Sequence, residues 1–317
     1  MRITVPSLTT VGLVAGVLTV VSASQLVPPR NQAVRPAAGK RMQTPTAARI
    51  ARGADLLAWS LRQLQARRSV SARLLQQIDL LGIRATGSGL YLDARSGDAF
   101  SFRLEIEFDF GGSTSRLVRV CDGRRLWIYE EMAGQKDLKQ VDLERVRRVL
   151  QQQGRGGDVE KAAWTGKLGR LEGLLITLSR DFRFGIAHRA ELYGVPTWKL
   201  TGTLDPEELP QQWSGPSGRG GGTPPGGHLL PAEMPDQVVV QLGRDDGFPY
   251  SIEYWRTKGR AGQGGGRLVS RIVFHQVTLD GPISPAFFTI ESAGLDPVDQ
   301  TDAFLNDVLA DSYRQPL

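Results

Sequence analysis

Cysteine and histidine are scarce in this 317-residue sequence, and their scarcity excludes several kinds of site. The one cysteine, Cys121, has no partner for an intramolecular disulfide. Its apolar neighbours predict a small buried hydrophobic residue rather than a reactive thiol. The three histidines, His188, His228 and His275, do not share the spacing of metal ligands, and no cysteine pair could complete a zinc site. We therefore expect no metal, no cofactor and a fold that its hydrophobic core alone stabilises.

Catalytic and nucleic-acid-binding motifs are also missing. The sequence has no Gly-x-Ser-x-Gly elbow and no Ser-x-x-Lys pair, and its glycine-rich tracts lack the context of a phosphate loop. The net charge of +6 comes without a dense block of Lys or Arg. We predict a protein that is not an enzyme and does not bind nucleic acid. A hydrolase acting on lipid or glycan is a rival that would need a nucleophile–base pair or a carboxylate pair inside a cavity.

The first 45 residues are predicted to precede the folded domain. Residues 1–23 combine a positive start, an apolar run over 8–21 and small residues at a cleavage point, which is the pattern of a secretory signal peptide. The apolar run is shorter than the ~20 residues of a spanning helix, so an uncleaved inner-membrane anchor is the second choice. Residues 24–45 are rich in Pro, Ala and Arg and predict a disordered tether. We expect an exported protein of the periplasm or cell envelope.

The clearest structural signal is a strict alternation over residues 99–110. Apolar residues stand at every even position from 100 to 110, and polar residues stand between them. Successive side chains of a strand point to opposite faces, so this is a long strand with one apolar and one charged face. Sheets with one solvated face are most often antiparallel.

The order of the predicted elements indicates an α+β fold. A helix at 50–64 precedes strands at 70–80, 83–92, 99–110, 117–121 and 126–129, and helices follow at 142–150 and 168–181. Strands return at 190–193, 196–204, 238–242, 250–255, 268–279 and 286–290, before a helix at 302–313. We predict a single curved antiparallel sheet with the helices on one side. The domain is expected to span 46–300, with a low-complexity insertion at 205–235 and a C-terminal helix or tail at 301–317.

The strands carry more large apolar side chains than a few short helices can cover. Burying one such side chain contributes ~1.5–3 kcal/mol, so leaving several exposed is costly. We therefore predict an apolar cavity that binds an apolar ligand, and the alternative is that the helices simply close the core. The predicted cavity residues are Phe100, Phe102, Leu104, Ile106, Phe108, Trp127, Tyr129, Trp198, Leu200, Ile252, Tyr254 and Phe274.

Three segments resemble motifs of the lipoprotein-carrier superfamily, which includes the periplasmic lipoprotein chaperone and outer-membrane lipoprotein-sorting proteins. They are residues 121–130 (CDGRRLWIYE), 243–254 (GRDDGFPYSIEY) and 279–290 (LDGPISPAFFTI). The resemblance implies an unclosed antiparallel half-barrel whose concave face is covered by a helical lid, with acyl chains bound beneath. The arginine that latches the lid in that family matches no single position here, and Arg103 is expected on the polar face.

The sequence thus predicts an exported, non-enzymatic protein that binds lipid or acylated lipoprotein under a helical lid and acts as a carrier. Envelope membrane proteins are the further partners that such a role implies. The alternative function is a structural or protein-interaction module of the cell envelope with a fully packed core. The two differ in whether the helices leave room on the apolar side of the sheet.

Overall fold

The computed structural model describes residues 52–80, 83–97, 99–109, 114–154, 168–204, 234–257, 266–290 and 294–312. The signal peptide, the tether and most of the insertion predicted at 205–235 lie outside these residues. Within the described ranges, no helix is both long and apolar enough to cross a membrane.

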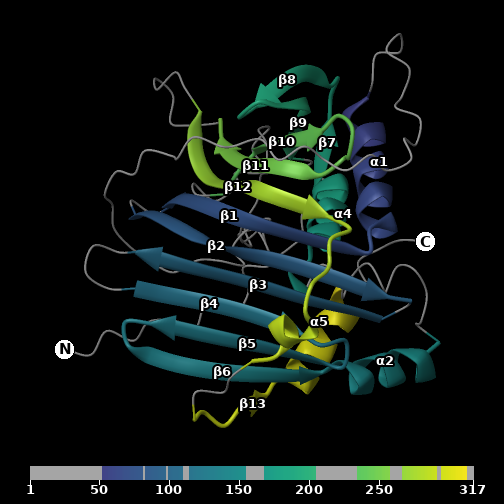
Figure 1. The fold of residues 1–317 in the computed structure, drawn as a ribbon, viewed down its shortest axis with the longest axis vertical. Helices are drawn as coiled ribbons and strands as arrows, with labels where there is room; N and C mark the ends of the chain where they lie inside the picture. The colour runs from purple at the N-terminus through teal and green to yellow at the C-terminus, as the bar shows by residue number, and fades with distance from the viewer. Residues whose placement is uncertain are drawn as a thin grey trace, which may run out of the picture.

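Thirteen strands form one sheet in the order β13-β6-β5-β4-β3-β2-β1-β12-β11-β10-β9-β7, and β8 pairs with β9 (Figure 1). Every pairing is antiparallel except the short one between β13 and β6. The order has two free ends, so the sheet is unclosed, and the predicted α+β half-barrel class is confirmed. The strands are β1 (Ser69–Leu80), β2 (Ile83–Ser96), β3 (Ala99–Asp109), β4 (Thr114–Cys121), β5 (Arg125–Met132), β6 (Gln135–Asp142), β7 (Phe182–Phe184), β8 (His188–Leu192), β9 (Val195–Leu204), β10 (Gln237–Gly243), β11 (Pro249–Arg256), β12 (Arg267–Leu279) and β13 (Val298–Asp299).

Four α-helices lie on one face of the sheet, which we call the helix face. They are α1 (Gly53–Ala66), α2 (Leu143–Gln152), α4 (Leu171–Asp181) and α5 (Thr301–Ser312). α2 begins where the sequence predicts, because the Asp142 side chain accepts a hydrogen bond from the Arg145 backbone N–H at 2.9 Å. α4 begins at Leu171 rather than at the predicted Leu168.

The helix face carries two separate hydrophobic cores. The first lies under α1 and α4, where Leu57 and Leu175 pack against strand residues such as Leu74 of β1. The second lies under α2 and α5, where Val146 and Val308 pack against Phe102 of β3 and neighbouring residues of β4 to β6. Figure 1 shows the two helix pairs over different halves of the sheet. The helix layer is therefore divided rather than continuous.

The opposite face is crossed by the C-terminal strap, residues 281–297, described except for 291–293 (Figure 1). We call this side the strap face. The strap contains a short 3-10 helix, η2 (Pro285–Phe288), and its Phe288 packs on Val118, Val120 and Tyr129. The chain then reaches the sheet edge, where β13 pairs with β6, and α5 follows on the helix face.

The strand predicted at 286–290 is wrong. Pro285 at the start of η2 has no N–H to donate to a sheet, and the Ser284 side chain caps the turn by accepting from the Ala286 N–H. The segment is a turn that places one aromatic residue into the sheet face, and its neighbour Phe287 stays exposed. The sequence does not predict β6, which lies next to β13 near one end of the sheet, because six of its eight residues are polar (Gln-Lys-Asp-Leu-Lys-Gln-Val-Asp).

Replacing Gly89 of β2 by alanine should destabilise the sheet strongly. A Cβ at Gly89 would overlap the backbone carbonyl oxygen of Glu105 on β3, so the two strands would have to separate. We expect the free energy of unfolding to fall by more than about 2 kcal/mol, measured by urea denaturation. Gly185→Ala is the matched control, because no atom lies within 4 Å of its added Cβ. Equal midpoints for the two variants would show that β2 and β3 do not approach as described.

Candidate functional site

The strand register decides which predicted cavity residues share a face. All of those outside β5 lie on the helix face: Phe100, Phe102, Leu104, Ile106, Phe108, Trp198, Leu200, Ile252, Tyr254 and Phe274. Trp127 and Tyr129 of β5 lie on the strap face, where Phe288 and the rest of the strap cover them. The structure therefore separates these two aromatic residues from the others, and they cannot line the same cavity.

Most of the helix-face residues belong to a closed core. Leu200 and Ile252 are 0% exposed beneath α1 and α4. A cavity of about 10 Å³ lies at the edge of this core, with room for about one water molecule. Its lining includes Leu64 of α1, Tyr91 of β2 and Leu171 of α4. This cavity is too small for an acyl chain.

An apolar strip remains between the two helix layers. We call it the central strip, and its members are Leu104 of β3, Leu117 of β4 and Ile128 and Met132 of β5. The first three are half-buried, and Met132 is 42% exposed. The central strip is therefore the part of the helix face whose apolar side chains the helices do not fully cover.

A buried charged network joins the start of α4 to β2. Arg170 donates two hydrogen bonds to the Asp93 carboxylate, at 2.8 and 2.9 Å, and forms an ion pair with Glu172 at 3.0 Å. Glu172 is also paired with Arg95. The Tyr91 hydroxyl donates to Asp93 at 3.1 Å and accepts from the Leu171 N–H at 3.2 Å. The contacts with Asp93, Arg95 and Tyr91 of β2 fix the start of α4 to the sheet.

Burial governs the protonation of this network. It raises the pKa of the Tyr91 hydroxyl, and the adjacent Asp93 carboxylate adds to the effect. Burial is the largest single effect and opposes the charge of Arg170, but the charge and hydrogen bonds of Asp93 and smaller contributions from other groups together outweigh it, so the pKa of Arg170 is raised. Arg170, 3% exposed, therefore remains a cation. The network is structural in character, since its charges compensate one another.

Arg119 of β4 lies on the helix face directly between Leu104 and Ile128. It makes no hydrogen bond and no ion pair with any residue that the structure describes, and its Nε is shielded from solvent. Burial lowers the pKa of this guanidinium. Gly169 lies against it, and a Cβ there would come 3.2 Å from Nη1. The charge of Glu130 partly offsets this effect of burial, but no described residue forms an ion pair with Arg119 at this end of the central strip.

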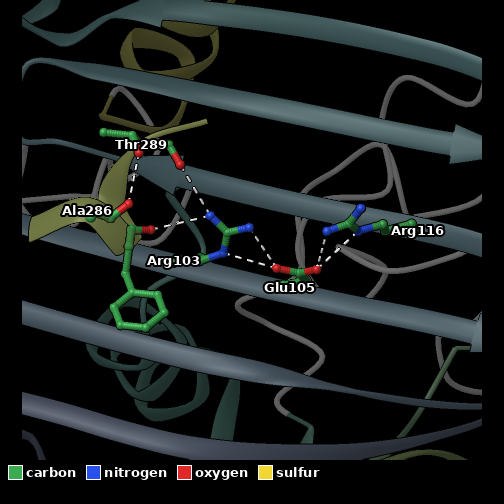
Figure 2. Close-up of polar contacts among 6 residues, drawn as sticks. Arg103, Glu105, Arg116, Ala286 and Thr289 are labelled. Atoms are coloured by element: carbon green, nitrogen blue, oxygen red, sulfur yellow. Dashed lines mark hydrogen bonds and ion pairs between the residues drawn. The ribbon is translucent and has the colours of Figure 1, made fainter. Parts of the chain in front are cut away.

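The strap face has its own polar cluster, shown in Figure 2. Arg103 of β3 lies on this face, as the alternation predicts, and its Nη1 donates to the carbonyl oxygens of Phe287 and Thr289, both at 3.3 Å. The Glu105 carboxylate accepts from Arg103 and, on its other oxygen, from Arg116. Burial opposes the charge of Glu105, but these hydrogen bonds outweigh it and lower its pKa. The cluster holds the C-terminal strap against the sheet.

The sequence analysis did not identify the charged residues Arg119, Asp93 and Arg170 on the helix face. Arg119 stands in an apolar run, at a helix-face position between Leu117 and Cys121. A lone charge in such a run is a signal that could have found it. Asp93 and Arg170 are 77 residues apart, and nothing in the sequence links them.

No family model and no curated protein matches this chain. Similar solved structures include the lipoprotein LppX from Mycobacterium tuberculosis, with 13% identity over 73% of this chain and 98% of that chain, and a TM-score of 0.35. LprF from Mycobacterium bovis is 12% identical over 73% and 94%, with a TM-score of 0.33. An outer membrane lipoprotein-sorting protein domain from Vibrio parahaemolyticus is 7% identical over 74% and 95%, with a TM-score of 0.31.

Proposed function

We propose that this protein is an exported, non-enzymatic lipid- or lipoprotein-binding protein that holds an acyl chain on the helix face of its sheet. The observation that carries the proposal is the central strip. Its half-buried Leu104, Leu117 and Ile128 and its exposed Met132 form an apolar surface that neither helix pair covers fully. Covering this surface with an acyl chain removes apolar area from water on both partners, which is the main driving force of such binding.

The pair α1 and α4 is the proposed lid. The two helices pack on each other over the first core, and hydrogen bonds join α1 to other parts of the chain. Two of these are the bond from the Ser60 hydroxyl to the Gly247 carbonyl oxygen and the bond from the Gly53 N–H to the Gly185 carbonyl oxygen. Movement of the lid would extend the acyl site from the central strip toward Leu200. A ligand that binds only the open state would shift the population toward it.

The alternative is a structural or protein-interaction module of the cell envelope. Its support is the tight packing of the first core, whose cavity holds about 10 Å³. A larger cavity of about 280 Å³ lies at the Asp122–Arg125 turn and the start of α2, and polar side chains such as Arg124 and Glu144 line it. Such a lining suits a hydrophilic group of a partner better than an acyl chain.

Replacing Leu117 by glutamate should weaken acyl binding while the protein stays folded. The charge would lie on the central strip, and moving an acyl chain over it removes the carboxylate from water. We expect a fluorescent fatty-acid probe to bind at least about tenfold more weakly, and less lipid to co-purify, as measured by organic extraction and mass spectrometry.

Leu75→Glu is the matched control, because Leu75 lies on the strap face of β1 and is 39% exposed. It should bind the probe as the unchanged protein does. If the unchanged protein carries no lipid and binds no acyl probe, the lipid-binding proposal is wrong and the packed module is favoured.

A further inference from the structure

Arg119 and the buried Arg170 both lie on the helix face, but they differ in whether a carboxylate compensates their charge. Arg170 is surrounded by the carboxylates of Asp93 and Glu172, at 2.8 and 3.0 Å, which compensate its charge. Arg119 has no such partner among the residues that the structure describes. A half-buried guanidinium with a shielded Nε and no acceptor is costly to maintain, so its presence needs an explanation.

The carboxylates nearest to Arg119 are already engaged or face away. Glu130 lies on the helix face one residue pair further along β4 and β5, but the Lys139 ammonium binds it at 2.7 Å. Glu105 is a neighbour in sequence register, but it points to the strap face and accepts from Arg103 and Arg116.

The position of Arg119 relates its charge to the central strip. Arg119 lies between Leu104 and Ile128, at one end of the strip, and Met132 lies at the other end. Met132 is four residue steps along β5 from Ile128, or about 13 Å at ~3.4 Å per residue. The helix-face residue between Ile128 and Met132 on β5 is Glu130, so the apolar path from Arg119 to Met132 runs over Leu117 of β4. A cation at one end of this partly exposed path is complementary to a ligand with an anionic head and a single apolar tail.

We infer that Arg119 binds the carboxylate of a single-chain anionic amphiphile whose tail lies along the central strip toward Met132. This inference rests on the proposed function and specifies its ligand class. A guanidinium and a carboxylate match in a planar, two-bond geometry, and Gly169 packs so closely on Arg119 that a side chain there would crowd Nη1. Bound there, the carboxylate supplies the ion-pair partner that the described residues do not.

The test compares two ligands with the same tail and opposite head charges. Laurate and dodecyltrimethylammonium are titrated calorimetrically, below their micelle concentrations, into the unchanged full-length protein, Arg119→Met and Arg119→Lys. We expect Arg119→Met to bind laurate at least about tenfold more weakly, while its binding of the cationic amphiphile is unchanged or tighter. Arg119→Lys keeps the charge but not the planar fork, so its laurate affinity should be intermediate.

Arg116→Met is the matched control, because Arg116 lies on the same strand with its side chain on the strap face. It should bind both amphiphiles as the unchanged protein does, and thermal melting of every variant confirms the fold. Equal binding of laurate to Arg119→Met and to the unchanged protein would overturn the headgroup inference and leave the proposed function standing. Failure of both amphiphiles to bind the unchanged protein would instead reject the proposed function itself.

Discussion

Arg170→Met should lower the free energy of unfolding by about 3–5 kcal/mol, one of the two largest effects that we expect. The substitution leaves the Asp93 carboxylate, 6% exposed, with the Tyr91 hydroxyl as its only hydrogen-bond donor among the bonds described above. It also leaves Glu172 with Arg95 alone. A buried carboxylate that loses its cation cannot regain water, so most of the desolvation cost remains unpaid. Urea denaturation followed by circular dichroism measures the effect.

Two further variants separate the loss of the buried ion pair from the general effect of removing an arginine. Arg180→Met removes an arginine at the other end of α4, where the side chain is 47% exposed beside Asp181. It should change stability by no more than about 0.5 kcal/mol. The double variant Arg170→Met with Asp93→Asn removes both charges and should recover at least about 1 kcal/mol. A loss below about 1 kcal/mol for Arg170→Met would mean that the network does not anchor α4.

The network also has a consequence for the proposed lid. It fixes α4 at Leu171, where the chain passes from the second core to the first: Leu168 packs in the second and Leu171 in the first. Between them, Gly169 lies against Arg119 and Arg170 binds Asp93. The segment that holds the lid to the sheet is therefore adjacent to the cation at the end of the central strip. A ligand bound to Arg119 would contact the start of α4.

The strands were the predictable part of this fold because their signal is local. The alternation over 99–110 needs no knowledge of the partner strands, and β3 covers 99–109 with its apolar side chains on the helix face. For β5, the local pattern does not predict which side chains lie on which face. Leu126, Trp127, Ile128 and Tyr129 are all apolar, so hydrophobicity does not reveal which of them share a face. Only the pairing of Leu126 with Cys121 fixes the register, and it places Trp127 and Tyr129 opposite to the predicted cavity.

Part of the apolar strand surface is covered by the strap, which the sequence does not predict. Counting helices assumed that all large apolar residues lie on one face, whereas a group of them lies on the strap face under residues 281–297. This strap has no periodicity of its own, and its contacts with β2 to β6 join residues far apart in sequence. The site residues Arg119 and Arg170 escaped prediction for the same reason, because their roles depend on residues that only the folded chain brings together.

Phe288→Ala should destabilise the protein by about 3–4 kcal/mol and release the C-terminal strap. Phe288 is 5% exposed and packs against Val118, Val120 and Tyr129, so its removal leaves a cavity between the strap and the sheet. Beyond Phe288, the nearby polar contacts of the strap are the two bonds from Arg103 to carbonyl oxygens, each 3.3 Å long. Hydrogen exchange measured by mass spectrometry should show faster exchange over 281–290 and over the β4 and β5 amides beneath, together with the loss of stability in urea.

Phe287→Ala is the matched control, because this neighbouring residue has the same side chain but is 51% exposed. It should cost less than about 1 kcal/mol and leave exchange over the strap unchanged. Laurate binding tests whether the strap and the proposed ligand site are independent. Under conditions where Phe288→Ala remains folded, it should bind laurate as the unchanged protein does, because Arg119 and Met132 lie on the other face. If the two phenylalanine variants were equally stable, the strap would not be a packed layer, and the aromatic residues Trp127 and Tyr129 would need another cover.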